Sequence, residues 1–218
     1  MIRSLAAVFG MAMMLCACAT GTTDISMAMN DDIAKTGLLS EATASVVSVA
    51  ATDARDGDKR DRIGDKRNGY GMVMGKIGTT EPVESVVKRV VGETFSANGH
   101  TVSESAGLAV ETEVTNFWFD YKTGLVTVEF FGDIQVLLTV KDLETDAVIF
   151  EEKFKGYHSE KTGGGLSKTW TKVMDAALQD LSREIGMSMG LMEALEAHSA
   201  AKAEPAPVHQ EEAEEVVS

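Results

Sequence analysis

The hydrophobic positions between residues 45 and 190 follow two periods, one typical of strands and one typical of helices. Apolar residues spaced three or four apart predict two helices, one that begins at Pro82 and ends at Asn98-Gly99 and one at about 166–185. Short β-branched or alternating runs predict five strands, at about 45–52, 70–77, 108–119, 126–140 and 148–154. The predicted order is therefore strand, strand, helix, three strands, helix.

The longest alternating run extends from Val126 to Val140. Its apolar residues share one parity, whereas polar residues such as Glu129 and Asp133 occupy the other, which is typical of a strand with one wet face. A sheet with one apolar face needs a single cover, and two amphipathic helices provide it. We therefore predict an α+β fold: a mainly antiparallel sheet of about five strands, with both helices packed on one face.

The first eighteen residues have the form of a lipoprotein signal. Arg3 precedes an uncharged apolar run of about a dozen residues, which is shorter than the roughly 20 that a spanning helix needs. The run ends at Leu15-Cys16-Ala17-Cys18, which resembles the bacterial lipobox. Of the two thiols, only Cys18 has a large apolar residue and a small residue at the expected positions before it. The alternatives are an ordinary secretory signal with Cys18 left free, or an uncleaved N-terminal anchor.

Lipidation of Cys18 predicts a membrane as the protein's first partner. Several buried acyl chains, at about 0.8 kcal/mol per methylene, hold a protein on its bilayer almost irreversibly. Ala19 follows the cysteine where the familiar inner-membrane retention signal has Asp. We therefore expect a lipid anchor in the outer membrane, with the protein facing the periplasm.

Composition divides the chain into four parts. Residues 1–17 are the predicted signal peptide, and residues 18–44, which are small and polar, are a predicted flexible tether. Residues 45–190 hold the periodic signals and form the predicted globular domain. Residues 191–218, which become rich in Ala, Glu and Pro, are a predicted disordered acidic tail.

The charge balance excludes one large class of partner. The chain has 218 residues, with 20 Lys and Arg against 34 Asp and Glu, so its formal net charge is −14. Because contacts with phosphate need a basic surface, we expect no nucleic-acid partner.

The most unusual segment is Asp53 to Asn68, which contains Gly-Asp-Lys-Arg twice. One interpretation is a recognition loop, because Arg side chains bind carboxylates and phosphates through two parallel hydrogen bonds. The other is a solvated hairpin whose charges neutralise one another. The candidate partner-binding residues, taken from this segment and the strand after it, are Asp53, Arg55, Arg60, Arg67 and Tyr70.

The remaining chemistry-bearing residues form no pattern that indicates catalysis. The four histidines show no metal-ligand spacing, the acidic residues of the loop match no calcium-binding loop, and no serine lies in a nucleophile motif. We expect no cofactor, no metal and no enzymatic activity.

Several motifs together resemble the YajG family of uncharacterised bacterial lipoproteins. They are the lipobox, Asp53-Ala54-Arg55 at the end of the first strand, Lys66-Arg67-Asn68-Gly69-Tyr70-Gly71, the Val-rich helix closing on Asn98-Gly99, and Asp175-Ala176-Ala177-Leu178. The resemblance covers the signal and about residues 45–186. It implies a periplasmic, outer-membrane-associated α+β module without known catalytic residues.

Two functions are consistent with these observations. The first is a non-enzymatic binding or structural module of the envelope, whose partner is an envelope protein or peptidoglycan. The alternative is an auxiliary lipoprotein subunit of an envelope transport or secretion complex.

Overall fold

The computed structural model describes residues 21–27, 37–68, 70–163 and 167–203. These residues form one eight-stranded sheet with three α-helices and two short 3-10 helices. In chain order the elements are β1 (Thr23–Ile25), η1 (Leu38–Glu41), β2 (Val46–Asp53), η2 (Gly57–Lys59), β3 (Gly64–Arg67), β4 (Val73–Thr79), α2 (Val83–Ala97), β5 (Thr101–Val102), β6 (Leu108–Thr123), β7 (Val128–Asp142), β8 (Ala147–Thr162), α3 (Ser167–Gly186) and α4 (Met189–Ala203).

The predicted fold class is wrong in the number of strands and in their pairing. Three long strands, β6, β7 and β8, form an antiparallel meander, but the other edge of β6 pairs in parallel with β2 and, further along, with β3. Two further parallel pairs join β1 to β4 and β2 to β5. The sheet is therefore mixed. Parallel pairing joins segments that are distant in sequence, so local periodicity does not reveal it.

The meander itself follows the predicted alternation. In β7 the even-numbered side chains from Phe130 to Asp142 are buried, and the odd-numbered ones are partly exposed. The pairing register of β6 shifts between Val114 and Asn116, where the apolar positions of the sequence change parity, as a β-bulge requires. The long strands thus have one apolar face and one wet face.

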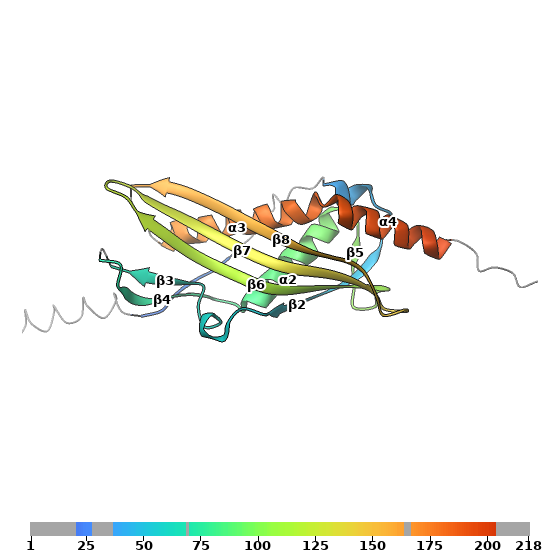
Figure 1. Ribbon diagram of the computed structural model, residues 1–218, viewed down its shortest axis with the longest axis horizontal. Coiled ribbons are helices and arrows are strands. Elements are labelled where there is room, and N and C mark those ends of the chain that lie inside the picture. The colour runs from blue at the N-terminus through green and yellow to red at the C-terminus, as the bar shows by residue number, and fades with distance from the viewer. Residues whose placement is uncertain (1–20, 28–36, 69, 164–166, 204–218) are drawn as a thin grey trace, which may run out of the picture.

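Two helices cover the apolar face (Figure 1). Helix α2 packs on β2 and β6, whereas α3 packs on β7 and β8. The hydroxyls of Thr94 in α2 and Ser182 in α3 are buried and lie 2.6 Å apart, so one hydroxyl donates to the other across the helix interface. Asn98 and Gly99 end α2 as predicted, with Gly99 at φ +89°, a conformation that glycine adopts without strain.

The predicted flexible tether contains ordered, buried structure. Ile25, Met27, Leu39 and Ala42 are all in the core, and β1 adds an edge strand to β4. The backbone N–H of Gly37 donates to the Asn98 side chain over 3.1 Å. A few widely spaced apolar residues are enough to order this segment, because they pack on a surface that the rest of the fold provides. The predicted signal peptide, residues 1–17, and Cys18 lie outside the described residues.

The predicted disordered tail is also wrong for residues 191–203. These residues belong to α4, which packs on η1 and β8 through the fully buried Leu191 and Leu195. The two leucines lie four residues apart and so share one face of the helix. Glu196 accepts hydrogen bonds from the backbone N–H and the hydroxyl of Thr43, which fastens α4 to the segment before β2. Residues 204–218 lie outside the described part of the chain.

Candidate functional site

A cleft of about 770 Å³ opens where β2 and β4 end and α2 begins. The two strands run in opposite directions and both stop at this point; β2 pairs with β6, whereas β3 lies between β4 and β6. The polar side chains of its lining are those of Asp24, Thr52, Asp53, Arg55, Arg60, Asp61, Arg62, Thr79, Thr80, Glu81 and Glu84. The segment that the sequence singled out therefore forms one wall of this cleft.

Arg55 is a buried structural residue of this wall. Only 3% of its surface is exposed, and its guanidinium binds both carboxylate oxygens of Asp53 at 2.9 and 2.8 Å. It also donates to the carbonyls of Arg62 and Phe117 at 2.9 and 3.3 Å. The hydrogen bond from Arg55 is the main reason that the pKa of Asp53 lies below its usual range. Arg55 thus holds the loop against β6.

Two other acidic groups of the cleft, Glu81 and Asp61, are also paired with cations. Glu81 accepts two hydrogen bonds from Arg89, at 2.7 and 2.8 Å, and these lower its pKa. Asp61 pairs with Lys76 and with Arg62, and the hydrogen bond from Lys76 is the main cause of its lowered pKa. These carboxylates are held ionised by their partners, which is typical of structural ion pairs rather than of general acids.

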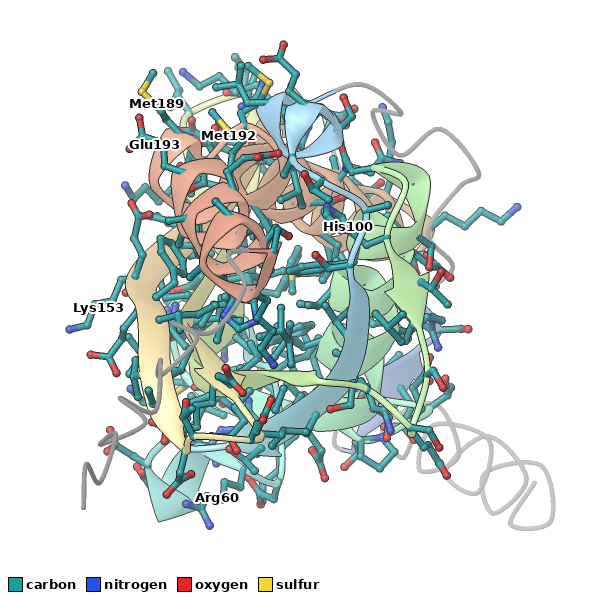
Figure 2. All side chains as sticks on the ribbon, turned by 90° about the vertical axis from the view of Figure 1, so that its right-hand side faces the viewer. Arg60, His100, Lys153, Met189, Met192 and Glu193 are labelled. Atoms are coloured by element: carbon teal, nitrogen blue, oxygen red, sulfur yellow. The ribbon has the colours of Figure 1, made fainter. Side chains whose placement is uncertain are left out.

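The five predicted partner-binding residues do not form one site. Asp53, Arg55 and Arg60 lie together at the cleft, where Arg60 is exposed and donates from its Nε to the Arg55 carbonyl over 2.9 Å. Figure 2 shows Arg60 pointing out from the body of the protein. Arg67 and Tyr70 belong to the β3–β4 hairpin instead. Tyr70 is 92% exposed, whereas Arg67 pairs with Asp120 over 3.4 Å.

The loop between β2 and β3 also reaches the wet side of the sheet. The Lys59 ammonium and the Arg62 guanidinium lie 6.0 and 5.9 Å from the ring centroid of Trp118, a residue of β6. At these distances a cation is attracted by the electrons of the indole face. Trp118 is thereby held on the wet side of the sheet rather than in the core.

Further aromatic residues lie on the same side of the meander. We define the outer face as the side of β6, β7 and β8 turned away from α2 and α3, centred on Trp118, Phe131, Asp133, Gln135 and Tyr157. Trp118, Asp133 and Tyr157 are directly opposite one another on the three strands. The rings of Phe131 and Tyr157 lie 6.5 Å apart, and Tyr157 is 44% exposed.

Polar groups between these rings are held in place by one another. Asp133 accepts from Gln135 over 3.1 Å and pairs with Lys155 over 3.1 Å, while Lys155 lies 5.3 Å from the Tyr157 ring. Lys153, one row further along β8, points away from the sheet into solvent (Figure 2). The outer face thus combines half-exposed aromatic rings with fixed amides, carboxylates and cations.

The sequence contained a signal for the outer face: aromatic residues at strand positions whose neighbours in the alternation are polar. Phe131 shares the odd parity of Glu129 and Asp133 in β7, and Trp118 follows the bulge that reverses parity in β6. Apolar residues at wet positions of a strand are candidates for recognition. The prediction concentrated on charged residues and so missed these rings.

One buried carboxyl lies apart from both the cleft and the outer face. Burial raises the pKa of Asp175, in α3, to about 6, and its Oδ1 has no hydrogen-bond partner within the described part of the protein. The Arg89 guanidinium opposes this rise. Among the described residues, no group of three His, Cys, Asp or Glu side chains is arranged to hold a metal ion.

Comparison with known proteins assigns the chain to a family. Residues 38–195 match the model of a family of uncharacterised lipoproteins, and the chain belongs to that family. Membership indicates a membrane-anchored protein of the cell envelope and confirms the broader part of the prediction. None of the curated proteins matches. In the described stretches, no helix combines the length and the apolar character needed to cross a bilayer.

Several solved structures resemble the chain at low sequence identity. A Xanthomonas campestris protein of the family DUF330 has a TM-score of 0.51 and 12% identity, and the match covers 84% of this chain and 98% of that one. A putative lipoprotein from Caulobacter crescentus has a TM-score of 0.42 and 11% identity, covering 79% and 98%. A minor lipoprotein from Acinetobacter baumannii has a TM-score of 0.42 and 11% identity, covering 67% and 93%. The Xanthomonas campestris structure supports the assignment of the fold, and it supports nothing about function.

Proposed function

We propose that this protein is a non-enzymatic binding module of the cell envelope that captures its partner through the outer face. The observation that carries this proposal is the outer face itself: Trp118, Phe131 and Tyr157 stay partly exposed on a broad sheet surface that no described helix covers. Rings fixed at a surface supply large contact areas at little entropic cost, and aromatic residues are enriched where proteins bind one another.

The charges around the rings support recognition rather than catalysis. Asp133, Lys155 and Arg62 are each held by an ion pair, so they present fixed hydrogen-bonding groups to a partner. The cleft offers a concave surface, but its carboxylates Asp53, Glu81 and Asp61 are committed to Arg55, Arg89 and Lys76. An envelope protein or peptidoglycan, both rich in polar groups, fits such a surface.

The proposal includes attachment to the outer membrane through acylated Cys18, with the module facing the periplasm. Family membership supports a lipoprotein, and the lipobox with Ala19 after the cysteine supports this residue and this membrane. The resemblance to the YajG family is part of the same proposal and rests on the short motifs around Asp53, Tyr70 and Asp175.

Photo-crosslinking in living cells tests the binding surface. A photoreactive phenylalanine replaces Tyr157 on the outer face or, as the matched control, Lys88 on the exposed side of α2. We expect adducts from position 157 only, and at least tenfold fewer of them when Trp118→Ala is added, because an aromatic residue central to an interface contributes about 2 kcal/mol or more.

The identity of the adduct separates the classes of partner. An adduct that lysozyme releases identifies peptidoglycan, and a discrete protein band identifies an envelope protein; a permease or ATPase subunit in that band would favour the auxiliary-subunit function. Equal adducts from positions 157 and 88, or an undiminished yield with Trp118→Ala, would contradict the proposal.

A further inference from the structure

Two hairpins project from the same end of the sheet (Figure 1). Strand β3 runs parallel to β6, with Gly64 beside Phe119, so the β3–β4 turn lies at the end where β6 passes into β7. The β7–β8 turn, at residues 143–146, lies at the opposite end. The molecule therefore has two distinct ends along its strands.

The end with the two hairpins carries apolar side chains in water. We call it the apolar end and define it by six residues: Tyr70, Met72, Val73, Met74, Leu125 and Val126. Leu125 is fully exposed, Tyr70 is 92% exposed and Val126 is 81% exposed. Turns normally carry Gly, Asn, Asp or Ser, so leucine and valine at a turn need an explanation other than turn geometry. Clustered exposed apolar residues mark surfaces for a protein or a membrane.

The two hairpins are fixed to one another. The Tyr121 hydroxyl accepts from the Arg67 backbone N–H and donates to the Arg67 carbonyl, each over 2.7 Å. The Arg67 side chain also pairs with Asp120 over 3.4 Å. Arg67, which the sequence indicated as a partner-binding residue, thus joins β3 to β6 and ties the two hairpins together near their turns.

The chain enters the fold at this same end. Strand β1 runs parallel to β4, with Thr23 opposite Ile77, and the Gly21 backbone lies against Gly75, close to the start of β4. Cys18 precedes Gly21 by three residues. Three residues span at most about 11 Å, so an acyl chain on Cys18 keeps Gly21 next to the bilayer surface. The ordered β1 leaves no long spacer between lipid and domain.

We propose that the apolar end inserts into the interfacial layer of the bilayer that holds the Cys18 lipid. This inference rests on the proposed anchor at Cys18. With the anchor this short, the apolar end is confined to within about one headgroup layer of the membrane, so burying its side chains there carries little additional entropic cost. A tyrosine at the rim fits the interface, where amphipathic rings are enriched.

The insertion gives the protein a fixed orientation. The strands then point away from the membrane. The outer face and the cleft are therefore not in contact with the bilayer and stay open to the periplasm. A partner is captured at a defined distance from the bilayer, which a flexible tether would not provide.

Depth-dependent quenching tests this orientation. The full-length acylated protein is reconstituted in vesicles of phosphatidylethanolamine and phosphatidylglycerol that contain a bromolipid. One environment-sensitive dye is attached at Val126→Cys or, as the matched control, at Leu143→Cys in the β7–β8 turn, which is also an exposed apolar position in a hairpin turn. We expect the bromolipid to quench the dye at 126 by at least about twofold and to leave the dye at 143 unchanged.

Each outcome decides one point. Protein that floats with the vesicles while both dyes stay unquenched overturns the insertion and leaves the anchor standing. Equal quenching at 126 and 143 contradicts the orientation. Protein that does not float, with Cys18 unmodified by mass, contradicts the anchor and this inference with it.

Discussion

Replacing Gly156 with alanine is expected to lower the free energy of unfolding by about 2–3 kcal/mol. Gly156 lies in β8 beneath α3, where an added Cβ would overlap the Ala177 carbonyl oxygen and lie 2.7 Å from the Leu181 Cβ. Both neighbours belong to a helix that is anchored along β7 and β8. The helix must therefore shift as a whole, and its contacts with Gly132 and α2 shift with it.

Gly92→Ala is the matched control. It is the same chemical change in the middle of α2, where nothing lies within 4 Å of the added methyl. Because alanine is the better helix former, we expect the free energy of unfolding to rise by about 0.5–1 kcal/mol. Urea unfolding of the two variants measures both values. Equal losses in the two variants would mean that α3 does not pack closely on β8.

Replacing Arg55 with alanine is expected to lower the free energy of unfolding by about 3 kcal/mol or more. The change leaves the Asp53 carboxylate, with a side chain only 14% exposed, without its cation and removes the donors to the carbonyls of Arg62 and Phe117. Arg60→Ala at the exposed rim of the same cleft is the control and should cost less than about 1 kcal/mol. Calorimetry of the two variants at neutral pH gives the comparison.

The cost of losing Arg55 should depend on pH. The folded-state pKa of Asp53 lies below its unfolded value, so the pair stabilises the fold above the unfolded pKa of about 3.9 and loses that contribution as the pH falls through the folded value. The stability difference between wild type and Arg55→Ala should therefore narrow below about pH 4. A small difference at neutral pH, or one that does not narrow in acid, would show that Arg55 is not the anchor of the loop.

Local sequence patterns were sufficient to predict the elements that bury one whole face of a strand or helix. The alternation in β7, the parity change in β6 and the apolar stripes of α2 and α3 each reflect one face packed against a neighbour, so their periods were readable. The parallel partners of β6 were not, because β2 and β3 are placed by pairing across long intervals of chain. β1 and α4 bury only a few residues each, and their composition therefore resembled that of unfolded chain.

The sequence alone could not decide the role of the charged loop, for a physical reason. A dense run of charges is typical both of a binding loop and of a loop that satisfies its own charges. Arg55 shows the second case, since its guanidinium is bound by Asp53 and by the carbonyls of Arg62 and Phe117. The rings of the outer face carry no charge; the bulge in β6 assigns Trp118 to this side of the sheet, and the odd parity of β7 assigns Phe131.

The mass of the mature amino-terminal peptide tests the central claim most directly, namely that the module is held in the envelope by a lipid on Cys18. We predict a peptide that begins at Cys18 and carries a diacylglyceryl group with an added acyl chain, and outer-membrane fractions that lose the protein when Cys18→Ser is introduced. A peptide with an unmodified Cys18, or a Cys18→Ser variant that stays in the membrane fraction, would contradict the account.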